Sequence, residues 1–324
     1  ELIKDRLRPL SNRATQGQYP PGSTFKVIMT IAGLEEGVLQ PEARISDPGY
    51  YNFGNRSFRD WKKGGHGSVD LHKAIVESCD VYFYQLGPRI GVDRIAKWAR
   101  TFGLGEKTGV ALDDERNGLV PDSEWKRKRY RQPWYPGETV SISIGQGYLT
   151  VTPLQLVNMI ATVANGGTLY RPRIVSKVES SDGATIREYG PEKIRTINLK
   201  PSTLERLRSA LADVVNGPGG TGGAARSSLV EIAGKTGTAQ VVEMKGGYVK
   251  TEQLAYFNRD HAWFISYAPV QNPQIAVVVL VEHGGHGGEA AAPMAKKVIE
   301  KYIELQKQPA DQRQVRVEGE NRAN

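Results

Sequence analysis

The sequence has very little cysteine and no long hydrophobic run. Its 324 residues include one cysteine, Cys79, so no disulfide bond can form within the chain. The longest apolar run is Ile275 to Val281, whereas a helix that crosses a bilayer needs roughly 20 apolar residues. The first residues also lack the regions of a signal peptide. We therefore exclude a disulfide-stapled scaffold and a spanning helix, and expect a soluble fragment or a processed form.

Acidic residues are outnumbered by basic ones, with 35 Asp and Glu against 43 Lys and Arg, which gives a net charge of +8. One cluster of basic residues with aromatic neighbours spans residues 126–134. No zinc-finger, RNP or helix-turn-helix pattern accompanies this cluster, so we predict no nucleic-acid partner. A basic surface equally suits an acidic peptide substrate or an anionic cell envelope.

Helix and strand patterns along the chain predict an α+β fold. Ser23 is a favourable N-cap for a helix that Gly37 closes, and Thr152-Pro153 opens another helix. In the last third, strand-like segments flank a hairpin turn. We expect an antiparallel sheet flanked by helices, plus a mainly helical subdomain. The expected helices are 23–37, 70–78, 93–102, 152–164, 201–215 and 293–305, and the expected strands of the last third are 232–242, 262–268 and 275–282.

An S-x-x-K pattern places Ser23 and Lys26 on one face of a predicted helix, where the lysine amine can take the serine proton. Ser123 and Lys126 match the same spacing, but they lie in a run of charges with little apolar periodicity. Ser23 instead follows Pro-Pro-Gly and begins an apolar helix, whose N–H groups point at developing negative charge. A plain helix cap is the alternative role for Ser23.

A Lys-Thr-Gly triplet, Lys235 to Gly237, leads a strand-like segment before the hairpin. An edge strand offers N–H and C=O groups to an extended peptide, and a glycine lets that peptide approach closely. The same triplet at residues 107–109 follows a helix and has the setting of a turn. Taken alone, Lys235 has the pattern of an ordinary surface lysine.

A Ser-x-Asp pattern, Ser78 to Asp80, lies between two apolar helical stretches. Residues 68–70 and 180–182 match the same pattern, so the tripeptide means little in isolation. Its order among the motifs, together with its placement between two apolar helical stretches, favours residues 78–80.

These three motifs, in this order, resemble the motif set of penicillin-binding proteins and serine β-lactamases. Residues 20–26 (PPGSTFK), 145–155 (GQGYLTVTPLQ) and 235–240 (KTGTAQ) resemble the transpeptidase domain of class B penicillin-binding proteins. Residues 78–80 and 125–136 resemble its elongation-specific branch, penicillin-binding protein 2. Asp80 stands where most of the wider family carries Asn, and that branch shares it. The resemblance implies a transpeptidase domain over residues 1–306, and we expect a disordered polar tail over 307–324.

The resemblance implies acyl transfer from a peptide that ends in D-Ala-D-Ala. Ser23 would attack the penultimate carbonyl, and an amine of a second stem peptide would resolve the acyl-enzyme into a cross-link. Lys26 would be the general base, which requires a pKa roughly three units below the usual ~10.4. Burial and the charge of Lys235 would lower it.

The remaining motif residues would orient the reactants, with no catalytic cofactor. Ser78 would relay a proton to the leaving group, and Asp80 would orient Ser78 and Lys26. The substrate carboxylate would lie against the residues of the Lys-Thr-Gly strand, and the backbone N–H groups of Ser23 and Thr238 would form the oxyanion hole. The residues of that strand are Lys235, Thr236, Gly237 and Thr238.

Four side chains before and inside the Ser-x-Asp motif form an acceptable tetrahedral zinc set: Asp47, Asp60, His66 and Cys79. Turn-forming aspartates and a small buried cysteine are the alternative interpretation. Some members of the penicillin-binding protein 2 branch are understood to carry a structural metal here. The resemblance therefore implies Zn²⁺ that braces the loop of Ser78 without taking part in the chemistry. His72 competes with His66 as a ligand, whereas the glycine-rich segment that contains His283 and His286 favours a loop.

Two other activities share these motifs. A D,D-carboxypeptidase or β-lactamase would pass the acyl group to water, although class A β-lactamases need an E-x-x-L-N pattern and this chain has no Leu-Asn dipeptide. A β-lactam sensor domain would be acylated once and then signal.

The resemblance also implies partners and a location. The implied ligands are peptidoglycan stem peptides and β-lactam antibiotics, and the implied partner is a polymerising glycosyltransferase of the elongation machinery. The implied location is the periplasmic face of the bacterial inner membrane, with an N-terminal anchor outside this chain.

Overall fold

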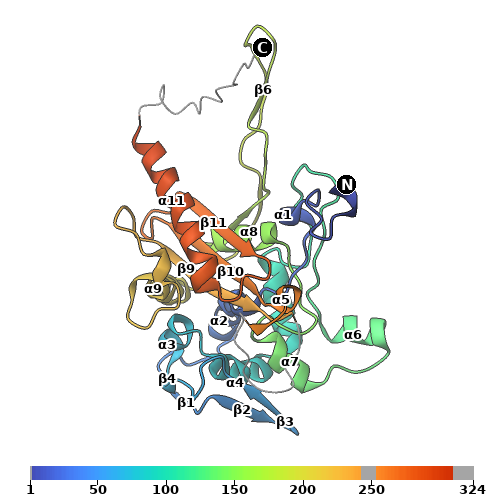
Figure 1. The fold of residues 1–324 in the computed structure, drawn as a ribbon, viewed down its shortest axis with the longest axis vertical. Coiled ribbons are helices and arrows are strands. Elements are labelled where there is room, and N and C mark those ends of the chain that lie inside the picture. The colour runs from blue at the N-terminus through green and yellow to red at the C-terminus, as the bar shows by residue number, and fades with distance from the viewer. Residues whose placement is uncertain (1, 242–252, 309–324) are drawn as a thin grey trace.

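A three-stranded antiparallel sheet lies at the centre of the molecule (Figure 1). The computed structural model describes residues 2–241 and 253–308. The strands are β9 (Ala233–Ala239), β10 (His261–Ala268) and β11 (Ile275–Val281), in the order β11-β10-β9. Trp263 of β10 lies opposite Gly237 on one side and Leu280 on the other. β9 is therefore an edge of this sheet, and it carries the Lys-Thr-Gly motif.

Both faces of the sheet are covered because β10 alternates between two hydrophobic clusters. Trp263, Ile265 and Tyr267 belong to the main core. Ala262, Phe264 and Ala268 belong to a second cluster under helix α11 (Ala292–Lys307), which crosses the sheet in Figure 1. On the other face, α8 (Pro153–Ala164) packs against β10 and β11, while α9 (Pro201–Asn216) follows β9.

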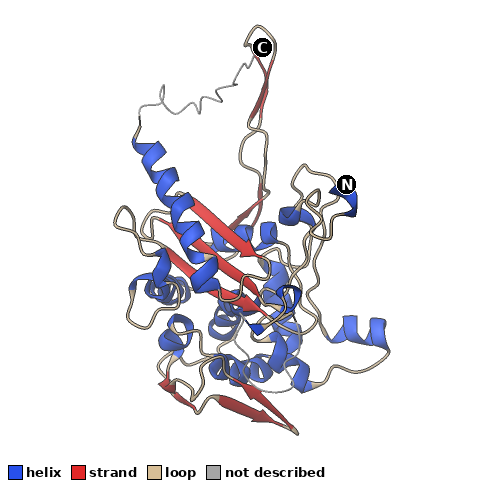
Figure 2. Cartoon of the chain, in the orientation of Figure 1, coloured by secondary structure: helices blue, strands red, loops and turns tan. Residues whose placement is uncertain are grey.

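The first half of the chain supplies the mainly helical part (Figure 2). Its central helix is α2 (Lys26–Glu35), which packs against α4, α5 and α9. Residues 26–33 of α2 are all buried, as expected of a helix in the middle of the core. The other helices before α8 are α1 (Arg13–Gln16), α3 (Leu71–Val76), α4 (Asp80–Ile90), α5 (Val92–Thr101), α6 (Ser123–Tyr130) and α7 (Pro136–Ile142).

The start of the first predicted helix differs from the expectation. Ser23 is not an N-cap, because a 3₁₀ turn, η2 (Gly22–Phe25), precedes α2. Pro21 occupies the cap position of this turn without a side-chain hydrogen bond, and Gly22 has a φ of 55°. In a 3₁₀ turn positions i and i+3 are eclipsed, so Ser23 and Lys26 still share one face.

The short strands form four separate pairs outside the main sheet. They are β1 (Ile45–Asp47) with β4 (Gly67–Val69), β2 (Tyr50–Phe53) with β3 (Arg56–Arg59), β5 (Thr168–Tyr170) with β8 (Lys193–Thr196), and β6 (Lys177–Glu179) with β7 (Thr185–Glu188). The β6–β7 hairpin extends away from the body (Figure 1). The remaining elements are short: η1 (Leu2–Lys4), η3 (Gly223–Ala225), η5 (Tyr256–Asn258) and α10 (Gly287–Ala290).

The predicted α+β class is confirmed, with an antiparallel sheet flanked by helices and a helical part beside it. Helix α11 ends at Lys307, one residue beyond the expected domain boundary. Most of the predicted polar tail, residues 309–324, lies outside the described residues. Among the described residues, no helix combines the length and apolar character that crossing a membrane requires.

Candidate active site

The three motifs meet between η2, the start of α4 and the edge strand β9. The Lys26 amine, fully buried at the start of α2, donates to three acceptors at the beginning of α4. It lies 2.6 Å from Asp80 Oδ1, 2.8 Å from the Ser78 carbonyl oxygen and 3.3 Å from Ser78 Oγ. Ser23 lies one turn before Lys26 and is half-buried, whereas its neighbours Gly22 and Thr24 are buried.

The Ser78 hydroxyl connects the two lysines. The Lys235 amine donates to Ser78 Oγ at 2.8 Å, and Lys235 is as completely buried as Lys26. Burial and, secondly, the nearby charge of Lys26 hold the pKa of Lys235 well below its usual value, while Asp80 opposes this shift. Burial raises the pKa of Asp80, against the opposing charge of Lys26. The site therefore holds two amines and one carboxyl group around a single hydroxyl.

Ser78 adopts a strained backbone conformation that specific contacts hold in place. Its φ is 56°, in the left-handed region that residues other than glycine seldom occupy. Its carbonyl accepts hydrogen bonds from Lys26 Nζ and, at 3.0 Å, from the Trp61 indole N–H. The Trp61 backbone N–H also donates to Asp80 Oδ2 at 3.2 Å. Trp61 thus supports two motif residues, and no spacing in the sequence indicates this.

The edge strand β9 brings the predicted substrate-binding residues to the same place. Thr236 Oγ1 lies 2.7 Å from the hydroxyl of Thr221, in the glycine-rich loop after α9. A Cβ at Gly237 would lie 2.8 Å from Thr24 Cγ2. Glycine is therefore needed here so that η2 can pack against β9, whereas the sequence analysis assigned it to the close approach of a peptide. Thr238 is half-buried at the end of the motif.

The four predicted zinc ligands converge beside this site. Asp47, Asp60, His66 and Cys79 are all buried, and their potential ligand atoms lie within 4.8 Å of one another. His66 Nδ1 is 2.7 Å from Asp47 Oδ2, and the Cys79 thiol donates to the same oxygen at 3.3 Å. Among the competing histidines, His72 is exposed, and its Nε2 lies 2.9 Å from Asp213 Oδ2. The backbone N–H of His283 donates to His261 Nδ1.

The donor set of this cluster fits a zinc ion. One nitrogen, one sulfur and two carboxylates form an acceptable tetrahedral set, and the buried His66 Nε2 has no hydrogen-bond partner among the described residues. Burial raises the pKa of Asp60, but hydrogen bonds from His66 and the Lys62 N–H together with the Lys26 charge bring it to about 2. Burial and the charge of Asp60 raise the pKa of the Cys79 thiol, a cost that a cation would offset.

The cluster is connected directly to the catalytic segment. Asp60 Oδ2 accepts hydrogen bonds from the N–H groups of Asp80, at 2.7 Å, and Val81, at 3.2 Å. A carboxylate in this position satisfies free N–H groups at the start of α4. Cys79, the N-cap of α4, lies between Ser78 and Asp80. Anything that orders this cluster also orders the Ser-x-Asp motif.

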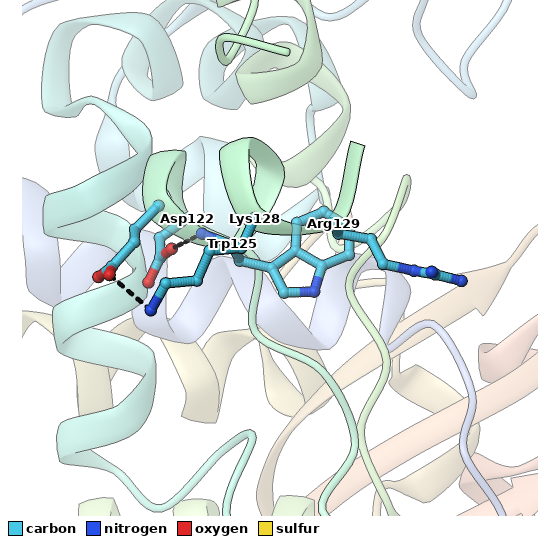
Figure 3. A pocket seen from close by; sticks show the side chains of 5 residues that line it. Asp122, Trp125, Lys128 and Arg129 are labelled. Carbon is cyan, nitrogen blue, oxygen red and sulfur yellow. Dashed lines mark hydrogen bonds and ion pairs between the residues drawn. The ribbon is translucent and has the colours of Figure 1, made fainter. Parts of the chain in front are cut away.

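The competing sequence matches have ordinary structural roles. Ser123 starts α6 and its hydroxyl donates to Asp93 at 2.9 Å. Thr108, in the second Lys-Thr-Gly triplet, donates its hydroxyl to Glu115 at 2.6 Å. A surface hollow of about 470 Å³ lies on α6 and is lined by residues outside the three motifs, which Figure 3 draws as sticks: Asp122, Glu124, Trp125, Lys128 and Arg129. Lys128 pairs there with Glu124 at 2.7 Å.

The fold and the three convergent motifs define a class that comprises penicillin-binding transpeptidase domains and serine β-lactamases. Residues 2–300 match the family described as penicillin binding protein transpeptidase domain. The chain is 42% identical to the peptidoglycan D,D-transpeptidase MrdA of Haemophilus influenzae, over 93% of this chain and 47% of that protein. The chain belongs to the penicillin-binding protein transpeptidase family, as the sequence analysis predicted.

Solved structures agree with this assignment. The Pseudomonas aeruginosa PBP2 structure in complex with WCK 5153 is 41% identical, with a TM-score of 0.81 over 93% of this chain and 64% of that one. A chain of a peptidoglycan synthase complex that coordinates polymerization and crosslinking is 34% identical, with a TM-score of 0.75 over 95% of this chain and 50% of that one. The chain spans about half the length of the curated relatives that it matches.

Proposed function

We propose that this chain is the catalytic domain of a peptidoglycan D,D-transpeptidase, which cross-links stem peptides through an acyl-enzyme on Ser23 and is acylated by β-lactams. The observation that carries the proposal is the Ser78 hydroxyl, 3.3 Å from Lys26 Nζ and 2.8 Å from Lys235 Nζ, beside the S-x-x-K turn. A hydroxyl between two buried amines can pass protons between them. The name of the Haemophilus relative supports the same activity.

Acylation begins when Ser23 Oγ attacks the carbonyl of the penultimate D-Ala. Lys26 accepts the Ser23 proton as the new C–O bond forms. The negative charge that develops on the carbonyl oxygen is stabilised by the backbone N–H groups of Ser23 and Thr238. Collapse of the tetrahedral intermediate breaks the C–N bond to the terminal D-Ala.

The leaving amine takes its proton from the Ser78 hydroxyl, which regains one from a lysine. Lys26 and Lys235 both donate to this hydroxyl, so either can resupply it. Burial lowers the pKa of Lys235 and so makes its proton easier to give up. In the second half of the reaction the acceptor amine loses a proton along the same route as it attacks the ester. The new amide is the cross-link, and Ser23 is regenerated.

The edge strand β9 supports binding of the peptide end. Lys235 and Thr236 offer an amine donor and a hydroxyl donor for the terminal carboxylate, and Thr238 adds a second hydroxyl beside Gly237. A β-lactam carries a carboxylate and a carbonyl and fits the same donors. Asp80, which accepts from Lys26 at 2.6 Å, orients that lysine and the neighbouring Ser78.

We also propose that Asp47, Asp60, His66 and Cys79 hold a structural Zn²⁺. When bound, zinc would supply no chemistry to acyl transfer and would brace the start of α4. His66 would donate one nitrogen, Cys79 its thiolate and the two aspartates one oxygen each. The burial of all four residues and the hydrogen bond that Asp60 accepts from the Asp80 N–H at the start of α4 support this role.

The larger assembly is likewise a proposal. The similar synthase complex supports a polymerising glycosyltransferase as the partner in the membrane. A peptidoglycan substrate supports a location on the periplasmic face of the bacterial inner membrane, and we propose that an N-terminal segment outside this sequence anchors the domain there. We assign residues 1–306 to the transpeptidase domain and residues 307–324 to a tail.

The first test measures the intact mass of the protein after incubation with benzylpenicillin and maps the adduct by peptide digestion. We expect one adduct on Ser23 that is absent in Ser23→Ala, with Ser123→Ala as the matched control that keeps it. An adduct on Ser123, or no adduct on the folded protein, would contradict the proposal.

A second measurement separates the transpeptidase from the two activities that share its motifs. A D-alanyl thioester substrate is supplied with and without a D-amino acid acceptor. A transpeptidase forms the new amide and turns over faster with the acceptor. A hydrolase releases only the free acid, and a sensor domain shows a single acylation with no turnover.

A further inference from the structure

The loop Gly145-Gln146-Gly147 after α7 contacts both segments that carry the proposed oxyanion donors. The Gly22 N–H, next to Ser23, donates to the Gly145 carbonyl at 3.0 Å. The Gln146 side-chain amide donates to the Thr238 carbonyl at 3.2 Å. The loop is thus hydrogen-bonded to the turn before Ser23 and to the end of the Lys-Thr-Gly strand.

The backbones at this point are in direct contact. A Cβ at Gly145 would lie 2.1 Å from the Gly22 carbonyl oxygen, and a Cβ at Gly22 would lie 2.4 Å from the Thr238 carbonyl oxygen. Both glycines also have positive φ angles, 74° and 55°. No side chain fits between the three segments, so the loop fixes how far Ser23 lies from Thr238.

Building on the function proposed above, we propose that Gln146 is a positioning residue for the oxyanion hole. In a strand, the N–H and C=O of one residue point to the same side. The Thr238 carbonyl accepts from Gln146, which lies outside the sheet, so the N–H of the same residue also faces away from β10. A donor fixed on the carbonyl therefore limits rotation of the Thr238 backbone and aims its N–H at the developing oxyanion.

The proposal predicts a specific defect. An amide is the group that satisfies the Thr238 carbonyl here, because its nitrogen donates and carries no charge. Loss of that donor leaves the Thr238 backbone freer without changing the residues that hold the substrate carboxylate. Acylation should become slower, while the initial complex with a β-lactam should keep its affinity.

The test compares Gln146→Glu and Gln146→Met with the parent domain. Stopped-flow acylation by benzylpenicillin gives the dissociation constant of the first complex and the rate constant of acylation separately. We expect the rate constant to fall about tenfold in both variants, the factor that corresponds to one net hydrogen bond, with the dissociation constant unchanged. A boronic acid that forms a tetrahedral adduct on Ser23 should bind about tenfold more weakly.

Asn158→Asp is the matched control. The Asn158 side-chain amide donates to the Tyr170 carbonyl at 3.1 Å, so this variant also exchanges an amide donor for a carboxylate on a backbone carbonyl, but outside the site. Its acylation rate should equal that of the parent. Thermal unfolding of each variant shows whether it is folded before the rates are compared.

Gln146→Glu provides a second readout that a merely structural role would not change. When the new carboxyl group is protonated it can donate to the Thr238 carbonyl again. The acylation rate of Gln146→Glu, divided by the parent rate at the same pH, should therefore rise as the pH falls from 8 to 5, whereas the ratio for Gln146→Met should stay constant.

Each result bears on the proposal. Slower acylation with unchanged first-complex affinity, together with recovery of Gln146→Glu at low pH, supports it. Unchanged acylation in the variants, an equal loss in Asn158→Asp, or a Gln146→Glu ratio that does not vary with pH overturns the role of Gln146 alone. Failure of the parent domain to be acylated on Ser23 overturns the proposed function and the role of Gln146 with it.

Discussion

Lys235, one of the two lysines that can resupply the Ser78 proton, is fully buried beside the other, Lys26. Its pKa is lowered by burial and by the charge of Lys26, so the protonated amine costs the folded state free energy. The opposing Asp80 is hydrogen-bonded to Lys26, not to Lys235. The same desolvation that makes Lys235 useful in proton transfer should therefore make it unfavourable for stability.

We expect Lys235→Met to unfold at a higher temperature than the parent at pH 7, because it removes a buried ionisable group. Its acylation rate should fall at least about 100-fold, because the same change removes a proton donor. Lys235→Arg, which stays charged, should also be acylated slowly. Differential scanning calorimetry and benzylpenicillin kinetics measure the two effects. Normal acylation of Lys235→Arg would show that a titratable amine is not required at this position.

The lowered pKa of His261 predicts how the stability of the protein depends on pH. Burial and, secondly, the charge of His283 lower its pKa to about 4, against an unperturbed value near 6.5, while Glu282 opposes the shift. Protonation would also displace the His283 N–H that donates to His261 Nδ1 at 3.0 Å. Between these two pKa values the unfolded chain binds more protons than the folded one, so stability should decrease as the pH falls from 6.5 to 4.

Urea unfolding at several pH values checks this expectation. His261→Gln should flatten the decrease between pH 6.5 and 4, because it removes the group that titrates. His72→Gln, at an exposed position, is the control and should keep the slope of the parent. An equal slope in the His261 variant and the parent would assign the pH dependence to other groups.

At the scale of elements, α11 shows where sequence periodicity is insufficient. The pattern puts Met294, Val298, Ile299 and Ile303 on one side of this helix. In the structure Ile299 and Ile303 are buried, whereas Met294 and Val298 are about half exposed. Ala292 and Ala295 complete the buried face, since small side chains let α11 lie close to the sheet. Alanine carries too little hydrophobic signal to indicate which face is buried.

Neighbouring substitutions in α11 test this assignment. Ile299→Ala should lower the free energy of unfolding by about 2–5 kcal/mol, because it leaves a cavity in the second hydrophobic cluster. Val298→Ala, one residue away on the exposed side, should change it by less than about 0.5 kcal/mol. Chemical denaturation measures both, and equal losses would show that the helix is rotated relative to this description.

In the site, too, local sequence patterns predict some features, and only the folded structure shows the others. Ser23, Lys26, Ser78, Asp80 and Lys235 are recognisable because short local motifs contain them. Two contacts that hold the site in place join residues that no local motif links. The Trp61 indole N–H donates to the Ser78 carbonyl. The Gln146 amide donates to the carbonyl of Thr238, which lies 92 positions later. No local period or spacing encodes such contacts. The sequence also does not distinguish the 3₁₀ turn at Ser23 from a helix N-cap, because both have the same local composition.

The cluster of Asp47, Asp60, His66 and Cys79 beside α4 leads to a prediction about the zinc content of the domain. If zinc is bound, the purified domain should contain about one zinc per chain, and His66→Ala or Cys79→Ala should remove it. Loss of zinc should lower the unfolding temperature and slow acylation of Ser23, since Asp60 caps the helix that carries Asp80. Elemental analysis and calorimetry measure this, with His72→Ala as control. Full zinc content in His66→Ala would exclude the cluster as the site.

At the scale of the whole molecule, the segment before Ser23 is attached to the far end of the chain. Glu282, just after β11, accepts from Arg13 Nε and from the Tyr19 hydroxyl, each at 2.6 Å, across separations of 269 and 263 residues. Burial and the bond to Glu282 raise the pKa of Tyr19, so its hydroxyl stays protonated as a donor. Pro20 adds a further tie, because its carbonyl accepts from the Trp263 indole at 3.0 Å. The approach to the S-x-x-K turn is thereby fixed on the sheet.

Removing the shared acceptor should loosen this whole arrangement. We expect Glu282→Ala to lower the free energy of unfolding by about 1–2 kcal/mol, since two hydrogen bonds to one partly exposed carboxylate are lost. Trypsin should also cleave after Arg13 faster than in the parent, because its guanidinium no longer ties α1 to β11. Glu289→Ala, at an exposed position, is the matched control. Unchanged cleavage in Glu282→Ala would mean that Pro20 and the strand contacts of Tyr19 hold the segment without Glu282.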